Sequence, residues 1–342
     1  MTTFAELTTL GVGGPLADLV TACTDEEIVG ALTDDAFVLG GGSNLVVADD
    51  AFSRRVVRIA TRGIEVQPDG DRVIVEAAAG EPWDEFVAFT VEQGFSGLES
   101  LSGIPGLVGA TGIQNVGAYG QEVSSVIGHV TVLDRLSGRI ESMSGAACGF
   151  GYRTSRFKAT PDRWVVLAAS FVLQPGGLGQ PRYAELAQAL GIQIGGVAGI
   201  EDIREAVLRL RRAKGMVLDP EDPDTRSVGS FFLNPVVAPH TAAGIPDCPR
   251  YPAAHGVKLS AAWLIEHAGV HRGWALPDGR QRVRISSKHT LAIANASNGT
   301  AAEVVALASE VRRRVHEAYR IVLEPEPRML NCSLQSLDES SP

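Results

Sequence analysis

The chain has 342 residues with 40 acidic and 30 basic side chains, and this net charge of −10 disfavours nucleic acid or an anionic membrane as partner, since both select basic surfaces. Its length indicates two or three domains, and an apolar content of 45% suffices for a substantial core. The four cysteines lie far apart in no zinc-binding spacing, which predicts free thiols and no bound metal. Without a signal-peptide pattern or a run of apolar residues long enough to span a bilayer, a cytoplasmic protein is expected.

The first half of the chain alternates short strands with one strong helix. An amphipathic stretch at 25–32 precedes a buried strand at 37–39, and strands are predicted at 56–59 and 73–75. Trp83, Phe86, Val87 and Val91 share one helical face after Pro82, with Gly94 just past the end. This spacing predicts a helix that begins at Pro82.

The second half has the longer helices. Strands are predicted at 126–133, 164–173 and near 283 and 291, and helices at 201–214, 259–267 and 302–319. The acidic, proline-containing segment 219–224 is the best candidate for an interdomain link, and the tail after Met329 is expected to be loose. The order is mixed α+β, without sustained βαβ alternation.

A glycine-rich stretch at 100–121 stands out from the rest of the chain. Glycine recurs at 103, 106, 109, 112, 117 and 120 among small apolar residues. Such density indicates either a structural loop that turns where a Cβ would clash, or a ligand that approaches the backbone closely. Because the stretch is too apolar for a solvated linker, a flat, partly apolar ligand explains it better.

A second glycine cluster, GGGSN at 40–44, directly follows the strand at 37–39. Its backbone N–H groups could bind a pyrophosphate, although a plain tight turn explains the cluster equally well. It is not a Rossmann fingerprint, because Leu45 stands where the third glycine belongs. Together, the two glycine segments suit a cofactor with both a diphosphate and a flat ring.

Three polar residues are candidates for chemistry. Ser230 lies between Gly229 and two phenylalanines without a hydrolase elbow, so it is either a serine bonded to nearby backbone or a proton relay. Arg153, in a basic run at 152–158, is either a clamp for carboxylate or phosphate or part of a solvated loop. Glu326 lies in EPEPR, which also fits a rigid acidic turn at a domain edge.

These segments, in this order, resemble the UDP-N-acetylenolpyruvoylglucosamine reductase (UDP-N-acetylmuramate dehydrogenase) family. The matching pieces are TLGVGGPLA at 9–17, VLGGGSNL at 38–45, SGIPGLVGATGIQNVGAYGQE at 102–122, CGFGYRTSRFK at 148–158, SVGSFFLNP at 227–235, KLSAAWLI at 258–265 and LEPEPR at 323–328. They span nearly the whole chain, and several motifs in the right order are far more specific than any one of them.

The resemblance implies an α+β fold with an FAD-binding domain of the vanillyl-alcohol-oxidase (PCMH) type. Two subdomains would hold FAD, one at 1–70 joined by the tail 327–342 and one at 71–222, and a C-terminal substrate domain would occupy 223–326. FAD would be bound non-covalently, and a monomer is expected. The cofactor-binding residues implied are Gly40, Gly41, Gly42, Ser43, Asn44, Leu45, Ile104, Pro105, Ala110, Thr111, Gly112, Asn115 and Gly117.

The implied reaction is NADPH-dependent reduction of the enolpyruvyl ether of UDP-N-acetylglucosamine to UDP-N-acetylmuramate, in peptidoglycan precursor synthesis. Ser230 matches the family's proton donor, and Arg153 and Glu326 match residues that stabilise the enolic carboxylate intermediate. The substrate-binding residues implied are Tyr152, Tyr183, Lys214, Asn234 and Arg272. Tyr183 resembles the mobile-loop tyrosine of one family subtype, whereas Lys214 also fits a cation that completes a helix dipole.

Two departures from the family pattern concern the substrate and flavin segments. Gly112 replaces a common proline, and Leu233 replaces a common lysine or glutamine, which removes a cation near the substrate. A covalent flavin oxidase is disfavoured because no histidine precedes His129. A non-catalytic nucleotide-binding protein would not need Ser230, Arg153 and Glu326 together.

Overall fold

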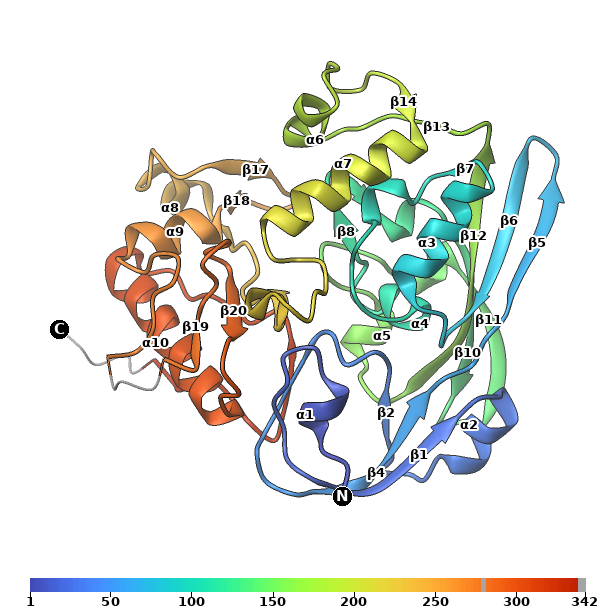
Figure 1. Cartoon of the computed structure of the whole chain (residues 1–342), viewed down its shortest axis with the longest axis horizontal. Coiled ribbons are helices and arrows are strands. Elements are labelled where there is room, and N and C mark those ends of the chain that lie inside the picture. Colours follow the sequence, from blue (N-terminus) through green and yellow to red (C-terminus); the bar gives the residue numbers. More distant parts are fainter. Residues whose placement is uncertain (278–280, 338–342) are drawn as a thin grey trace. The chain divides into compact units, whose positions relative to one another are not determined.

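The computed structural model describes residues 1–277 and 281–337, and the chain divides into two compact units, each considered by itself (Figure 1). Unit 1 comprises Met1–Pro15, Ser43–Phe52 and Lys214–Pro342, and unit 2 comprises Leu16–Gly42 and Ser53–Ala213. The chain therefore passes from unit 2 to unit 1 inside the second glycine cluster, between Gly42 and Ser43. It returns to unit 2 between Phe52 and Ser53, and it enters unit 1 again after Ala213, at the end of the predicted helix at 201–214.

Unit 2 is built on an antiparallel sheet whose strands follow the order β11-β10-β12-β6-β5, with β7 paired to β12. The strands are β5 (Ile64–Asp69), β6 (Arg72–Ala78), β7 (Phe95–Ser96), β10 (Ile127–Asp134), β11 (Arg139–Ser144) and β12 (Trp164–Pro175). In the β6–β12 register Val75 lies opposite Phe171, and both are fully buried. Figure 1 shows α3 (Trp83–Glu92) and α4 (Val108–Thr111) on one face of this sheet.

The aromatic face predicted for α3 packs in the core of unit 2. The rings of Trp83 and Phe86 lie 6.0 and 5.1 Å from that of Phe171 on β12, and the Trp83 indole donates to the carbonyl of Leu101. The helix begins one residue later than predicted, since Pro82 is its N-cap. Burial of aromatic side chains contributes about 2–3 kcal/mol each, which fixes the helix on the sheet.

A smaller sheet of unit 2, in the order β1-β4-β2, sets the direction of the chain into the second glycine cluster. Its strands are β1 (Leu16–Ala22), β2 (Phe37–Leu39) and β4 (Phe52–Ile59), and α2 (Asp25–Ala31) connects the first two. Strands β2 and β4 are parallel, and Leu39 opposite Arg58 is the last pair before Gly40. Because β2 ends directly before Gly40, the second glycine cluster begins at a fixed edge of this sheet.

The remaining elements of unit 2 are short except for α7. They are β8 (Gly117–Ala118), β9 (Gln121–Glu122), α5 (Arg156–Ala159), β13 (Leu178–Gly179), α6 (Ala184–Ala189), β14 (Ala198–Gly199) and α7 (Ile200–Ala213), with single 3-10 turns at Glu99–Leu101, Val123–Ser125 and Gly145–Cys148. The buried face of α7 carries Ile203 and Val207, as its periodicity predicts.

Unit 1 contains two three-stranded sheets and the long helix α10 (Ala301–Tyr319). The first sheet has the order β15 (Ser227–Ser230), β20 (Ala292–Asn295) and β19 (Val283–Ile285). The second has the order β16 (Val236–Val237), β18 (Val257–Leu259) and β17 (Arg250–Pro252). The other helices are α1 (Phe4–Leu7), α8 (Pro239–Ala243) and α9 (Ala261–His267), with a 3-10 turn at Pro223–Thr225. Thr300 and Glu303 form a capping box at the start of α10, which places the predicted seam of Val304, Val311 and Val315 in the core.

The tail after Met329 is ordered where it was expected to be loose. Strand β21 (Arg328–Leu330) pairs in parallel with β3 (Leu45–Val47), and the Gln335 amide donates to the hydroxyl of Ser309 at 3.0 Å. The prediction was wrong for this part of the tail because pairing with β3, which is distant in sequence, makes residues 328–330 a strand. Residues 338–342 lie outside the described residues.

Two other segments show what local patterns miss. Strand β5 was not predicted, because it contains Pro68 and most of its side chains are exposed. The segment 219–224, expected as a link, lies within unit 1, where the buried Asp224 carboxylate accepts the amide of Ser287. Over the described part of the chain, no helix combines the length and apolarity that crossing a membrane requires.

Candidate active site

The two glycine segments of unit 2 meet backbone to backbone. A Cβ added at Gly41 would lie 2.9 Å from the Cα of Gly106, a distance that real Cβ contacts do not tolerate. Gly42 has a φ of +63°, in the left-handed region that favours glycine. At Gly40, by contrast, the nearest atom to an added Cβ is the Cβ of Ala110 at 3.8 Å. The cluster is therefore packed on one side and leaves space on the other.

Several glycines of the stretch 100–121 have a structural cause. Gly109 is the second residue of α4 and lies directly against Ala79. A Cβ added at Gly109 would lie 2.6 Å from the Cβ of Ala79, and the Gly109 amide donates to the Ala79 carbonyl. Gly103 has a φ of +72°, in the left-handed region that favours glycine, and its amide donates to the Asp84 carboxylate at 2.5 Å. The structural reading thus holds for these two positions, while the space beside Gly40 and Ala110 suits a ligand.

Asn115 holds the end of this stretch. Its side chain is buried, donates to the Glu122 carboxylate at 2.9 Å and to the Gly151 carbonyl at 3.0 Å, and accepts from the Ser124 amide at 3.1 Å. Its φ of 47° lies in the left-handed region, where Asn is tolerated better than most residues. Asn115 was predicted as a cofactor contact, and the structure gives this side chain three protein partners.

Arg153 is fixed against the backbone of the same stretch. Its guanidinium donates from Nη2 to the Gly117 carbonyl at 2.7 Å and from Nη1 to the Asn115 carbonyl at 3.3 Å. It follows Tyr152 in the tight turn where Gly151 and Thr154 pair, and its own φ is 51°. A bulky side chain in this region costs about 1 kcal/mol, so the bonds to the guanidinium hold a strained turn in place.

The residues of unit 2 fit an FAD. Gly40, Ala110 and Gly112 are small, and an added Cβ at Gly112 would make only ordinary contacts with Ile127 and Phe150, at 3.7 and 3.9 Å. Small residues leave backbone N–H groups accessible to phosphate oxygens and a flat surface for a ring. Ile104 and Pro105 are half-buried and contribute apolar surface.

In unit 1, Ser230 and Glu326 lie on neighbouring extended segments. Phe232 pairs with Pro325, the Glu326 amide donates to the Phe231 carbonyl at 2.8 Å, and the Leu233 amide donates to the Glu324 carbonyl at 3.0 Å. Phe231 and Phe232 are buried, while Ser230 and Glu326 are half-buried. The two phenylalanines thus anchor a partly exposed serine beside an acidic segment nearly one hundred residues later in sequence.

The end of the second glycine cluster is bonded to this acidic segment. The Asn44 side-chain amide donates to the Glu326 carbonyl at 3.5 Å, and the Arg328 amide donates to the Asn44 carbonyl at 3.0 Å. Leu45 then pairs with Arg328 in the β3–β21 ladder. Within unit 1, Ser43, Asn44 and Leu45 are therefore held by the same segment that carries Glu326.

The predicted substrate-binding residues divide between the units. Tyr152 and Tyr183 lie in unit 2 and are 39% and 42% exposed, so both rings are accessible. In unit 1, Asn234 accepts the first amide of α9, from Ala261 at 2.9 Å, and Arg272 is exposed. Lys214 follows the last residue of α7 and is half-buried, so the helix-end interpretation stays open beside the substrate one.

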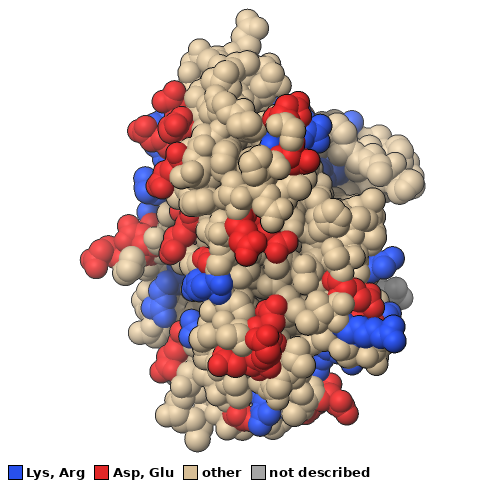
Figure 2. Space-filling view, turned by 90° about the vertical axis from the view of Figure 1, so that its right-hand side faces the viewer, with Lys and Arg blue, Asp and Glu red and all other residues tan. Residues whose placement is uncertain are grey.

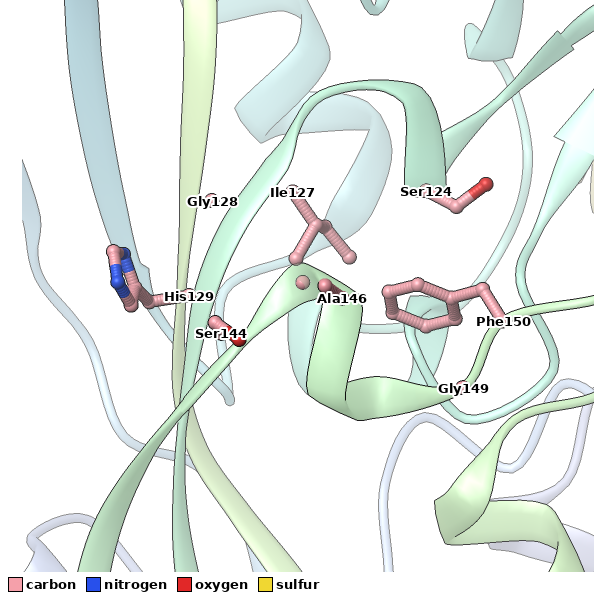
Figure 3. Close-up of a pocket in the computed structure, with 9 residues that line it drawn as sticks. Ser124, Ile127, Gly128, His129, Ser144, Ala146, Gly149 and Phe150 are labelled. Carbon is pink, nitrogen blue, oxygen red and sulfur yellow. The ribbon is translucent and has the colours of Figure 1, made fainter.

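Two further features are the charge on one face of the surface and one hollow in unit 2. Figure 2 shows acidic and basic side chains interspersed on one face, without one large basic patch. A hollow of about 580 Å³ in unit 2 is lined by Ser124, Ile127, Gly128, His129, Ser144, Gly145, Ala146, Gly149 and Phe150. Figure 3 shows Ile127 and Phe150 near one another, with His129 apart from Phe150. The hollow contains none of the residues predicted from sequence.

Sequence reasoning missed the residues that brace the predicted ones. Gln121 accepts the Ser100 amide at 3.0 Å and donates to the buried Glu99 carboxylate at 3.5 Å, which joins β9 to the start of the glycine stretch. Glu122 receives the Asn115 amide. The polar pair that follows Gly120 was the available signal, since charged and amide groups beside a glycine turn often bond to backbone.

Comparisons with known proteins cover nearly the whole chain. Residues 15–144 match a family model described as an FAD-binding domain, and residues 219–330 match the C-terminal domain of UDP-N-acetylenolpyruvoylglucosamine reductase. These matches confirm the predicted combination of an FAD-binding domain with a distinct C-terminal domain, and they confirm FAD as the cofactor.

Individual relatives agree along most of their length. UDP-N-acetylenolpyruvoylglucosamine reductase of Streptomyces coelicolor is 48% identical over 96% of this chain and 89% of its own. The Nocardia farcinica protein of that name is 52% identical over 94% of this chain and 87% of its own. A crystal structure of the Thermus caldophilus reductase aligns with a TM-score of 0.67 at 26% identity, over 96% of this chain and 97% of that chain. The chain therefore belongs to the UDP-N-acetylenolpyruvoylglucosamine reductase family of flavin-dependent oxidoreductases.

Proposed function

We propose that this protein uses NADPH and FAD to reduce the enolpyruvyl ether of UDP-N-acetylglucosamine to UDP-N-acetylmuramate, with Ser230 as proton donor. Membership of the family supports the substrate. The pairing of the Ser230 and Glu326 segments supports the assignment of chemistry to these residues. The two glycine segments would hold FAD, and when bound it would supply the two-electron chemistry that links NADPH to the alkene. One alkene would be reduced for each NADPH oxidised, with hydride added at the β-carbon of the enolpyruvyl group and one proton at the α-carbon.

In this proposal Ser230 supplies that proton from its hydroxyl. A serine hydroxyl is a weak acid, but the carbon it protonates becomes strongly basic as negative charge passes toward the adjacent carboxylate. Ser230 ends β15 directly before the buried Phe231, so its hydroxyl lies at the border of an apolar core. At such a border water screens charges only weakly, and polar groups that are already in place need little reorganisation during proton transfer.

Arg153 and Glu326 are proposed to stabilise the enolic carboxylate. The guanidinium is a fork of five N–H donors, of which the bonds to the Gly117 and Asn115 carbonyls fix the orientation. The backbone of Glu326 makes two hydrogen bonds, from its amide to the Phe231 carbonyl and from the Asn44 side chain to its carbonyl. These bonds orient the residue without using its carboxylate.

The binding assignments are also proposals. FAD would contact 40–45 and 104–117, and Tyr152, Tyr183, Lys214, Asn234 and Arg272 would contact the nucleotide parts of the substrates. The accessible ring of Tyr183 supports the subtype with a mobile tyrosine loop. The proposed domains remain 1–70 with the tail 327–342, 71–222 and 223–326.

An anaerobic absorbance trace tests the reaction. NADPH is added to the FAD-loaded protein, followed by the enolpyruvyl UDP-sugar. The expected result is bleaching of the flavin band with NADPH and recovery with that sugar. Bleaching without recovery would assign the chain to another acceptor, and protein that cannot be reconstituted with FAD would contradict the flavin assignment.

The Ser230→Ala variant tests the proton donor. Loss of a general acid costs about 10²- to 10⁴-fold in the step it serves. We expect bleaching by NADPH at the parent rate and recovery with the sugar slowed by that factor. Ser227→Ala, a change of the same kind at the start of β15, is the control. Recovery at the parent rate in Ser230→Ala would exclude the role.

A further inference from the structure

Tyr119 adopts a backbone conformation that its side chain does not favour. It occupies the turn between β8 and β9 with a φ of 50°, next to Gly120 with a φ of +80°. Left-handed backbone is unfavourable for a bulky L-residue, because its Cβ clashes with the following carbonyl oxygen. Such strain persists only where the surroundings determine the conformation, so the contacts of Tyr119 need an account.

The hairpin that carries Tyr119 is fixed at both strands. On β8, the Gly117 carbonyl accepts from the Arg153 guanidinium at 2.7 Å. On β9, the Gln121 side chain bonds to the Ser100 amide at 3.0 Å. A turn held from both sides presents its central side chain in one direction.

That side chain meets the segment that carries Tyr183. The rings of Tyr119 and Tyr183 lie edge to face, with centroids 5.7 Å apart and planes at 83°. A Cβ added at Gly120 would lie 3.3 Å from the carbonyl carbon and the Cβ of Arg182, so the turn and the Arg182 backbone are also close. Two successive residues of the turn thus contact two successive residues of the segment.

The segment that carries Tyr183 packs on a small core. Tyr183 is the N-cap of α6, whose buried residues form a small core with α7 of Leu186, Ile203, Ala206 and Val207. Tyr119 packs against that core from outside the two helices. A cluster of this size contributes little, so elements that rest on it open more readily than the main sheet.

The Tyr119 hydroxyl is suited to a partly buried position. Burial raises the pKa of Tyr119 to about 12, although the Arg211 guanidinium acts in the opposite direction. The phenol therefore stays neutral near pH 7 and keeps its ring in the packed cluster.

We propose that Tyr119 is a positioning residue that holds the Tyr183 ring in the orientation used to bind the nucleotide diphosphate of the substrate. The inference rests on the proposed function, because Tyr183 is assigned there to the substrate. Tyr183 is 42% exposed, so its contact with Tyr119 leaves surface for a ligand. Because the loop that carries Tyr183 is mobile in the proposed subtype, a contact that favours this orientation lowers the ordering cost of binding by about 0.5–1.5 kcal/mol, or about two- to twelvefold in affinity.

The decisive variant is Tyr119→Asn, because Asn tolerates the left-handed backbone and removes only the ring. Steady-state kinetics of the FAD-loaded chain should show KM for the enolpyruvyl UDP-sugar raised about three- to tenfold. The value of kcat and the rate of flavin bleaching by NADPH should be unchanged. Tyr119→Phe keeps the ring contact and should restore the parent KM. Tyr119→Leu serves as the second ring-deleting variant if Tyr119→Asn does not retain FAD.

A double-mutant cycle separates positioning from general support of the fold. In a Tyr183→Leu background, Tyr119→Asn should raise KM no further, since the ring it positions is gone. Tyr319→Leu, which removes a ring packed on Trp263 in unit 1, should leave KM unchanged. An unchanged KM in folded Tyr119→Asn, or the same increase in both backgrounds, would overturn the inference. Failure of the proposed function would appear differently, as a parent chain that does not turn over this sugar.

Discussion

The two units hold their parts of the proposed site by different means. In unit 1, Ser230 and Glu326 are placed by backbone pairing, through the Phe232–Pro325 bridge and the bonds that flank it. In unit 2, Arg153 and Asn115 are placed by side chains that bond to backbone carbonyls, and both residues have positive φ. Strand pairing fixes a residue without strain, whereas a turn at positive φ needs further bonds to persist.

This difference separates stability from chemistry. A side chain at the end of a ladder, such as Ser230, is replaceable without loss of the bonds that place it. The Asn115 side chain, in contrast, itself makes the hydrogen bonds that hold the turn, so its replacement removes them. We therefore expect substitutions of Ser230 and Glu326 in unit 1 to change the reaction rate alone. Substitutions of Arg153 and Asn115 in unit 2 should change both the reaction rate and the stability of the fold.

The largest effect is expected for Arg153→Lys. Lysine is a point charge that cannot donate to the Gly117 and Asn115 carbonyls and also present a fork to a carboxylate. Recovery of the flavin band with the enolpyruvyl UDP-sugar should slow about 10²- to 10³-fold, the usual result of removing one preorganised donor. Stopped-flow absorbance measures this step apart from reduction by NADPH.

Arg156→Lys provides the matched control, since Arg156 is exposed three residues later in the same basic run. It should leave both half-reactions at the parent rate. An equal effect of the two substitutions would assign Arg153 to the solvated loop that the sequence also permitted.

Asn115→Ala should destabilise unit 2 by about 2–4 kcal/mol. It leaves the Glu122 carboxylate, the Gly151 carbonyl and the Ser124 amide without their bonds to Asn115, and it places Ala at a φ of 47°. Asn115→Gly should recover about 1 kcal/mol of this loss, because only the backbone strain is relieved. Urea unfolding of FAD-loaded protein, followed by flavin fluorescence, measures both.

The comparison with unit 1 is made by Asn298→Ala. Asn298 has a similar φ of 53°, but it is exposed and its side chain accepts a hydrogen bond from Arg226. Its loss should cost about 1 kcal/mol or less. A cost at Asn115 no larger than this would show that its three bonds do not hold the turn.

Much of the framework was predictable because its signals are local. The aromatic face of α3 and the seam of α10 each follow one helical period, and the strand before Gly40 is a short apolar run bounded by glycine. The second glycine cluster was also identified from its position directly after that strand, and Leu45 in the place of the third glycine excludes a Rossmann fingerprint.

What was not predictable depends on contacts between distant parts of the chain. The Phe231 carbonyl is paired to Glu326 by a hydrogen bond that no local pattern encodes, and β21 is a strand because β3 is available to pair with it. Likewise, the GAYG sequence around Tyr119 indicates a turn, but its aromatic partner lies beyond residue 180. Sequence identified the polar residues, whereas topology decides which of them a hydrogen bond joins.

The smallest effect concerns ion pairs on the two long helices, and it depends on pH. On α10 of unit 1, hydrogen bonds from Arg313 and Arg314 lower the pKa of Glu310 from 4.5 to about 2. Because the folded pKa is the lower one, the pair stabilises fully above the unfolded pKa, near 4.5, and loses this contribution as the pH falls through about 2. Glu310→Gln should therefore lower the free energy of unfolding by about 0.5–1 kcal/mol at pH 7 and by progressively less below pH 4.5.

On α7 of unit 2, Glu205 is 79% exposed and 3.9 Å from Arg209, so Glu205→Gln should change stability by less than about 0.3 kcal/mol at any pH. Urea midpoints of both variants at pH 7, 4 and 3 test this difference, and a pH-independent loss in Glu310→Gln would mean that packing rather than charge holds the side chain.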